Sequence, residues 1–240
     1  MSQSPGLFLL GLFLCIGLAG SGYFISQTMY NAKVALNTAE AKGLAERRVK
    51  ADRANWTLTF RIAGRDKSNI SWLYAQSEKN QKKIVDLLKE NGFSDEEIKL
   101  GVIDYIYREF RDDDQKLVDE LHQLNGSIHI ETGQVDLVSK VRTSVNKLIA
   151  EGIDIQNSEP RYIFTKLNDI KPEMLSEATQ NARIAANEFA ENAGVTVGGI
   201  RNARQGSFYV RDAGQEYGDT RKIEKDVRVV TTITFYLTDD

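Results

Sequence analysis

The hydrophobic pattern of the chain changes after its first thirty residues. From Gly6 to Ile25 no charged side chain occurs, and every Asp, Glu, Lys and Arg follows Tyr30. Twenty helical residues rise about 30 Å, the thickness of a bilayer's hydrocarbon core. We therefore expect residues 1–30 to form one transmembrane helix that anchors the chain. The small residues at 19–22 leave a cleavable signal peptide as the alternative.

Two details extend this reading of the N-terminal region. Gly17 and Ser21 are small residues four apart, a spacing that lets membrane helices approach closely, so they are candidates for packing between anchor helices. Residues 31–48 are rich in alanine and charged side chains and show no obvious apolar face. We expect residues 31–48 to form a stalk or linker, and residues 49–240 to form the folded domain.

The clearest strand is predicted at residues 54–62, where apolar and polar side chains alternate. A helix follows, with leucines and an isoleucine on one face, and it ends near Asn91–Gly92. Ser94 and Glu97 then have the spacing of a capping box. This first part of the folded region therefore combines a half-buried strand with an amphipathic helix.

The remaining pattern continues to mix strands and helices. Strands are predicted at 102–110, 127–132, 161–165, 206–210 and 227–237, and helices are predicted from about 134 to Gly152 and from Asn168 or Asp169 to Gly194. Between the first two strands we expect an acidic, helix-capable stretch and a turn at Asn125–Gly126. A charged loop at 211–225 separates the last two strands. Strands joined by helices and by short turns indicate an α+β fold, with helices packed on a mixed sheet.

Composition narrows the function classes. A formal net charge of -3 over 240 residues is too slight to indicate nucleic-acid binding, and we expect no nucleic-acid partner. Cys15 is the only cysteine, so the folded region has no disulfide. Lys33 and Lys42 follow the apolar run, which by the positive-inside rule would keep the folded region in the cytoplasm, but two lysines are too few to decide the orientation.

Candidate catalytic and metal-binding groups are few. The acidic run 112–114 lacks the alternating ligand spacing of a calcium loop, so we expect a solvated loop. His122 and His129 have no cysteine beside them to complete a zinc site. Ser127, His129 and Glu131 would share one strand face, but no oxyanion device accompanies them. We expect a polar strand face, no cofactor, no metal and no enzymatic activity.

Three polar residues near the last strands are our candidates for a contact site. Arg201, Arg204 and Gln205 precede Gly206, and they would line either an anion-binding surface, an intersubunit contact or a solvated strand edge. The glycine pair 198–199 lacks the setting of a phosphate-binding fingerprint and predicts a bend or bulge.

Five blocks of sequence resemble a known family. They are GLAERRVKAD at 43–52, YIFTKLNDIKPEML at 162–175, the following EATQNARIAANEFAENAG, then IRNARQGSFYV, and finally KDVRVVTTITFYL. In this order they are similar to the bacterial SIMPL-domain proteins, in the branch of periplasmic or membrane-anchored members. The resemblance covers essentially everything after the anchor.

The resemblance implies α/β units, a location in the cell envelope, and self-association into rings or channel-like assemblies in some relatives. It supplies no catalytic residues. We therefore expect a single-pass inner-membrane protein whose folded region lies in the periplasm and forms a ring-like homo-oligomer. In this reading the domain is a non-catalytic scaffold or a stress-related module, and an envelope hydrolase or small-ligand-binding protein is the alternative.

Overall fold

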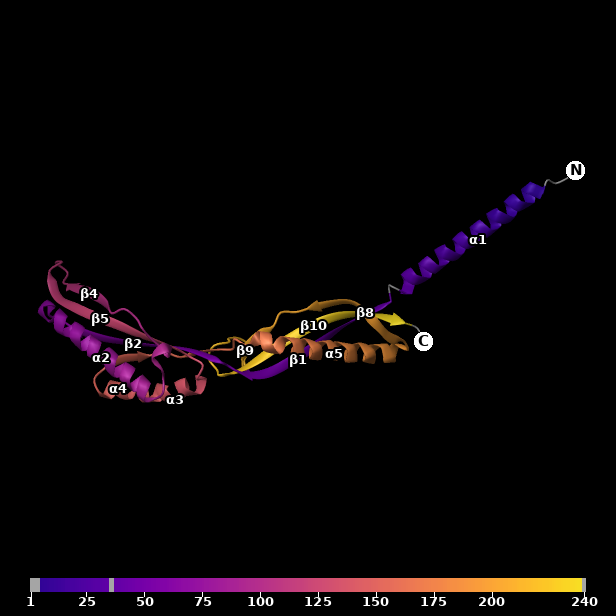
Figure 1. The fold of residues 1–240 in the computed structure, drawn as a ribbon. Coiled ribbons are helices and arrows are strands. Elements are labelled where there is room, and N and C mark those ends of the chain that lie inside the picture. Colours follow the sequence, from indigo (N-terminus) through magenta and orange to yellow (C-terminus); the bar gives the residue numbers. More distant parts are fainter. Residues whose placement is uncertain (1–4, 35–36, 239–240) are drawn as a thin grey trace. The chain divides into compact units, whose positions relative to one another are not determined.

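A computed structural model describes residues 5–34 and 37–238 of the chain (Figure 1). The chain forms two compact units where one folded domain was expected over residues 49–240. Unit 1 comprises Met1–Glu46, Lys171–Phe208 and Arg228–Asp240. Unit 2 comprises Arg47–Ile170 and Tyr209–Val227. Each unit has its own buried cluster of apolar side chains.

The N-terminal apolar helix is present as expected. Helix α1 spans Pro5–Val34, and its stretch Gly6–Ala32 is long and apolar enough to cross a membrane. The apolar side chains of this stretch are exposed rather than packed in a core. Exposure of so many apolar side chains is costly in water and is accommodated in a lipid bilayer.

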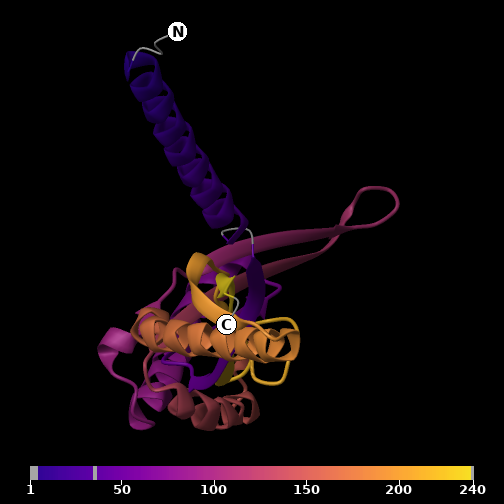
Figure 2. The same ribbon diagram turned by 90° about the vertical axis from the view of Figure 1, so that its right-hand side faces the viewer.

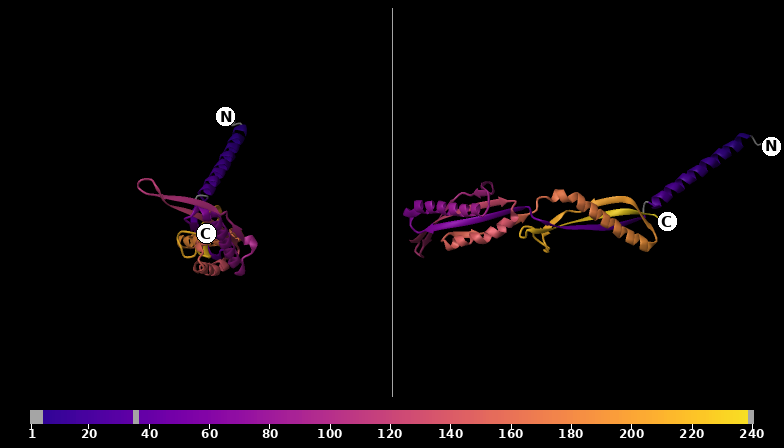
Figure 3. Two further views of the ribbon diagram at one scale, coloured as in Figure 1. Left: turned by 90° about the vertical axis from the view of Figure 1, so that its left-hand side faces the viewer. Right: turned by 60° about the horizontal axis from the view of Figure 1, so that its bottom comes forward.

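Unit 1 packs one long helix on an antiparallel sheet, as the right-hand view of Figure 3 shows. The strand order is β1 (Thr38–Lys50), β10 (Glu224–Thr238) and β8 (Thr196–Gln205), and the helix is α5 (Leu167–Ala193). The register between β8 and β10 shifts twice along β8, which places a bulge at the expected glycine pair 198–199. The dividing points between the units fall inside β1, α5 and β10.

The prediction of a stalk over residues 31–48 is wrong. Helix α1 continues to Val34 and β1 begins at Thr38. The buried face of β1 consists of Ala41, Gly43 and Ala45, which carry too little hydrocarbon for the alternation to stand out in the sequence.

Small residues let α5 lie directly on β1. A β-carbon added to Gly43 would stand 1.8 Å from the carbonyl oxygen of Ala178, so the two backbones meet with no room for a side chain. Ala178, Ala182 and Ala186 lie on the buried stripe of the helix, together with Met174 and Ala190. Phe235 and Ile233 of β10 supply the larger apolar groups of this core.

Unit 2 is a second antiparallel sheet with helices on one face. Its strand order is β3-β5-β2-β6, with β4 also paired to β5 and β7 to β2. The strands of this sheet are β2 (Arg53–Gly64), β3 (Ile98–Leu100), β4 (Asp104–Arg111), β5 (Leu117–Thr132), β6 (Asp154–Asn157) and β7 (Arg161–Ile163), and the helices are α2 (Ile70–Glu90), α3 (Val135–Val145) and α4 (Lys147–Ala150). Strand β9 (Tyr209–Asp212) pairs with β10 and not with this sheet. The predicted α+β class, with helices packed on sheets, is confirmed.

The core of unit 2 lies between this sheet and its helices. Trp56, Leu58 and Phe60 on β2 and Ile128 on β5 are fully or almost fully buried, and Val138 of α3 packs in the same cluster. The alternation seen in the sequence therefore assigned the buried face of β2 correctly. The capping box of Ser94 and Glu97 is also present, at a short helical turn before β3.

Two sequence expectations in unit 2 are wrong. Asn125 and Gly126 lie inside β5 rather than in a turn, because Gly126 sits opposite Phe60 and leaves space for its ring. A β-carbon at Gly126 would stand 2.2 Å from the ring carbon Cζ. The acidic stretch after residue 110 forms a hairpin turn and the first half of β5 instead of a helix.

Candidate interaction surface

Strands β4 and β5 form a long two-stranded arm, which we call the β4–β5 hairpin. Its register runs from Asp104 opposite Asn125 to Arg111 opposite Leu117, with an irregularity after Phe110. Figure 2 shows its tip standing clear of the helices of the same unit. Among the described strands, β4 pairs with β5 alone, so its other edge is unpaired.

The hairpin exposes apolar side chains. Tyr105, Tyr107, Phe110, Leu117 and Val118 retain between 43% and 67% of their accessible surface. Soluble surfaces rarely gather this many large apolar groups on one protruding element, and such patches usually bind another molecule. These aromatic residues were missing from our sequence prediction, although the alternation of Tyr105 and Tyr107 was a usable signal.

The base of the hairpin is held by a buried histidine. His122 stacks on the rings of Tyr107 and Tyr105, with ring centroids 5.1 and 6.1 Å away. Its Nδ1 lies 2.7 Å from the hydroxyl of Tyr105. Its Nε2 lies 3.2 Å from a carboxylate oxygen of Glu120, close enough for an ion pair when the ring is protonated but without the geometry of a hydrogen bond. His122 therefore has a packing role in the hairpin.

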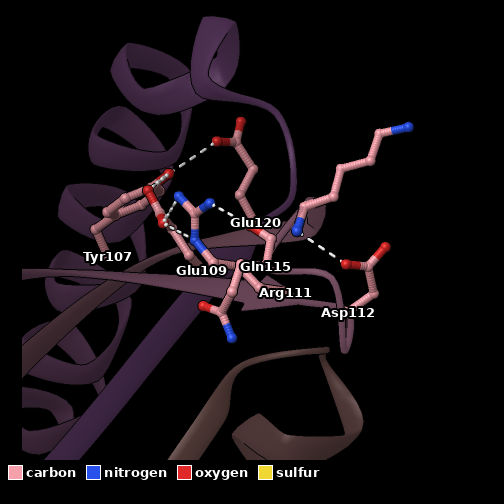
Figure 4. Close-up of polar contacts among 7 residues, drawn as sticks. Tyr107, Glu109, Arg111, Asp112, Gln115 and Glu120 are labelled. Carbon is pink, nitrogen blue, oxygen red and sulfur yellow. Dashed lines mark hydrogen bonds and ion pairs between the residues drawn. The ribbon is translucent and has the colours of Figure 1, made fainter.

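A second polar group fixes Tyr107 (Figure 4). Its hydroxyl donates to Glu109 at 3.0 Å and lies 3.2 Å from Glu120. Desolvation, together with these two carboxylates, raises the pKa of Tyr107 to about 12. The proximity of His122 lowers the pKa of Glu120, and hydrogen bonds from Arg111 lower that of Glu109. The phenol is therefore kept neutral beside two ionised carboxylates.

The tip of the hairpin is a structured turn. Arg111 donates from Nε and Nη2 to Glu109 and from Nη1 to the carbonyl of Gln115, as Figure 4 shows. The carboxylate of Asp112 accepts the backbone N–H of Lys116 at 2.8 Å. Gln115 adopts a positive φ of 63°. The acidic run 112–114 thus forms the exposed turn of the hairpin, in agreement with the solvated loop predicted there.

The open face of the unit 2 sheet is polar. Ser127, His129 and Glu131 lie on it, as their alternation predicts. His129 contacts Ser127 Oγ at 3.3 Å through Nε2 and Thr57 Oγ1 at 3.1 Å through Nδ1, whereas Glu131 accepts from Lys99 at 2.6 Å. The carboxylate therefore does not orient the imidazole, and the triplet lacks the relay of a hydrolase.

A cavity of about 390 Å³ opens on the same polar face. Its charged lining is the ion pair of Arg61 with Asp154, whose closest atoms are 2.5 Å apart. The amides of Gln123, Asn125 and Gln156 complete its polar wall. These groups offer hydrogen bonds to a small polar molecule, and they contain no group set up to act as a nucleophile.

The candidates chosen from the sequence lie elsewhere. Arg201, Arg204 and Gln205 are exposed residues of β8, an edge strand of unit 1. Arg204 sits opposite Thr232 and Gln205 opposite Thr231, so these two point to different faces of the sheet, and Arg201 falls in the register shift. The structure therefore does not bring the three side chains together on one face.

The predicted packing pair in the anchor is exposed on α1. Ser21 donates from Oγ to the carbonyl of Gly17 at 2.7 Å, a bond within the helix. The hydroxyl is therefore hydrogen-bonded within its own helix, and helix pairing through Gly17 and Ser21 stays a prediction.

These features define an α+β protein of two units, with an apolar N-terminal helix and a projecting hairpin. The model of the SIMPL family, described as proteins of unknown function (DUF541), matches residues 40–235. The chain belongs to this family. Among curated proteins none matches it.

A solved structure can be aligned with this chain over much of the length of both. It is a hydrolase from Listeria innocua, 10% identical, and the match covers 80% of this chain and 91% of the other. Its TM-score is 0.20. A superposition this poor carries no argument about fold or activity.

Proposed function

We propose that this protein is a membrane-anchored component of the bacterial cell envelope whose SIMPL region self-associates. Helix α1 crosses the inner membrane once, and both folded units lie in the periplasm. Copies of the chain form a ring-like homo-oligomer that acts as a non-catalytic scaffold or a stress-related module. Several anchors in one assembly hold it at the membrane more firmly than one anchor would.

The observation that carries this proposal is the β4–β5 hairpin. It combines an unpaired strand edge with exposed aromatic and aliphatic side chains, and both features favour association with another chain. The length and apolarity of α1 support the anchor. Arg201, Arg204 and Gln205 on the exposed edge strand β8 are proposed as a second intersubunit or anion contact.

The molecular mass of the full chain in mild detergent tests the self-association. Light scattering coupled to size exclusion should give several chains per particle after the detergent mass is subtracted. A strict monomer across the accessible concentration range would refute the assembly.

A reporter fused after Asp240 tests the orientation of the anchor. An enzyme that is active only in the periplasm should be active in this fusion, and one that is active only in the cytoplasm should be silent. The opposite pattern would place the folded units in the cytoplasm. The intact mass of the mature chain separates a retained anchor from a cleaved signal peptide, because cleavage near residues 19–22 removes most of α1.

The polar cavity supports a second candidate, an envelope protein that binds or hydrolyses a small ligand. Its ion pair and amides suit a neutral, hydroxyl-rich or amide-rich molecule. Monosaccharides and dipeptides are practical probes. A rise in the urea unfolding midpoint caused by one of them, and lost in Arg61→Ala, would favour this candidate over a scaffold.

A further inference from the structure

The unpaired edge of β4 is only partly protected against pairing. Natural edge strands are blunted by a short length, by prolines, by bulges or by charged side chains, especially lysines. Strand β4 has four charged residues and an irregularity after Phe110, but Glu109 and Arg111 are paired with each other. Strand β4 has eight residues, Asp104–Arg111, without a lysine or a proline. All eight are exposed except the half-buried Ile106. Its backbone therefore offers a row of donors and acceptors that a further strand can satisfy.

Asp104 and Arg108 are the two charged residues of β4 outside the ion pair of Glu109 with Arg111. Asp104 and Arg108 are exposed and form no ion pair with any residue that the structure describes. They lie on the same face of β4, four residues apart, with Ile106 midway between them. An antiparallel partner strand with the same sequence would place an Asp opposite each Arg.

We propose that β4 pairs with β4 of a second copy of this chain, antiparallel, about a two-fold axis that passes through Ile106. The inference rests on the proposed self-association and names one of its contacts. In this register Asp104 faces Arg108 of the other copy twice, Ile106 faces its own counterpart, and Tyr105 faces Tyr107. Opposite charges and aromatic pairs directly across a sheet both stabilise strand pairing.

Geometry restricts the alternatives to a few registers. Side chains opposite each other in a sheet share a face, so a symmetric antiparallel pair must be centred on a residue rather than between two residues. An axis at Arg108 would set two guanidinium groups against each other and Asp104 against Asp112. An axis at Tyr107 would set Asp104 against Phe110. Only the axis at Ile106 pairs both charges with opposite charges.

Thiol crosslinking of the full chain in mild detergent tests the register. The background is Cys15→Ser, which removes the only native thiol. In the proposed pairing the two copies of residue 106 have β-carbons about 5 Å apart. Ile106→Cys should therefore give a covalent dimer with a short bifunctional thiol reagent. Phe110→Cys is the matched control, because Phe110 is exposed, takes no part in the proposed charge pairs, and its two copies are eight residues apart along the pair, about 26 Å.

Each outcome of this experiment has a stated meaning. A covalent dimer from Ile106→Cys but not from Phe110→Cys supports the register. Equal crosslinking of both variants, or of neither while light scattering still shows an oligomer, overturns the β4 pairing and leaves the proposed assembly standing. A monomer by light scattering overturns the assembly as well.

Charge reversal gives an independent test that needs no cysteine at the axis. Asp104→Arg or Arg108→Asp alone converts both cross-strand pairs to like charges, and we expect dimer dissociation to become easier by about tenfold or more. The double variant Asp104→Arg/Arg108→Asp should recover the wild-type value. A mixture of the two single variants should associate better than either alone. Equal dissociation constants for all of these proteins would overturn the proposal.

Discussion

Lys225 and Asp212 form an ion pair that is shielded from solvent in unit 2. Nζ of Lys225 lies 2.5 Å from Oδ1 of Asp212 and also donates to the carbonyl of Asp219, while the carboxylate accepts the N–H groups of Arg221 and Lys222. Burial opposes ionisation of Asp212, but the hydrogen bonds, led by that from Lys225, hold its pKa below the usual value. This pair closes the loop between β9 and β10.

We expect Asp212→Asn to destabilise unit 2 by about 3–5 kcal/mol, because it leaves a buried ammonium without a countercharge. Urea unfolding of the full chain in detergent, followed by tryptophan fluorescence, measures the change, since Trp56 is buried in the core of this unit. Asp113→Asn in the exposed hairpin turn is the matched control. Equal midpoints for the two variants would contradict a stabilising role for the pair.

The same pair makes a prediction about pH. The folded-state pKa of Asp212 lies below the value of about 3.9 expected when unfolded, so its ionisation stabilises the folded chain above that pH. This contribution is lost as the pH falls through the folded-state pKa. The difference in midpoint between wild type and Asp212→Asn should therefore be smaller at pH 3 than at pH 7. A difference that does not change between these two pH values would show that Asp212 is not the group responsible.

Gly126 is held by a steric requirement that local sequence does not show. We expect Gly126→Ala to destabilise unit 2 by about 1–3 kcal/mol, because its methyl group would overlap the buried ring of Phe60. Urea unfolding again measures the loss, and Ser127→Ala at the next position is the control. Adding Phe60→Leu should recover part of the stability. If the double variant loses more stability than Gly126→Ala and Phe60→Leu lose together, ring overlap is ruled out as the cause.

The turn predicted at Asn125–Gly126 is absent because a contact distant in the sequence decides the local structure. The dipeptide favours a turn because asparagine and glycine tolerate a positive φ. The partner that decides the outcome, Phe60, is far away in the sequence and meets Gly126 only after β2 and β5 have paired. Buried side chains of β2 were predictable, because their alternation is a local property.

At the scale of elements, the β4–β5 hairpin depends on its own polar contacts near the tip. Its distal part packs few buried side chains, so turn and cross-strand hydrogen bonds provide most of its order. Such elements occupy the low-stability end of a protein. The charges of this segment were visible in the sequence, but the hairpin was not predicted, because its acidic residues also suit a helix.

Arg111→Ala should loosen the hairpin tip without unfolding unit 2. The guanidinium bonds both Glu109 and the carbonyl of Gln115, so its loss releases the turn from the strand. We expect faster amide exchange in peptides covering residues 108–119 and no change in the urea midpoint. Lys116→Ala, whose side chain makes no described contact across the turn, is the control. Unchanged amide exchange in Arg111→Ala would show that backbone hydrogen bonds alone keep the tip ordered.

Over the whole molecule, two separate cores share one continuous chain. The core of unit 2 is built from large aromatic and aliphatic groups, and the described core of unit 1 is built mainly from alanines with two larger residues of β10. The sequence predicted the anchor, the α+β class and the family, because each leaves a signal in local composition or motif order. It did not predict the second unit, because β1 has a buried face of alanine and glycine that resembles a linker.

Gly43→Val tests whether the two cores unfold independently. The new side chain would meet the backbone of α5 at Ala178, and a helix backbone cannot give way as a flexible side chain can. We therefore expect faster amide exchange throughout β1, β8 and α5, with the protection of β2 and β5 retained. Leu44→Val, on the exposed face of β1, is the matched control. Loss of protection in β2 and β5 together with α5 would mean that the units form one cooperative structure, since damage in either core would then be shared by both.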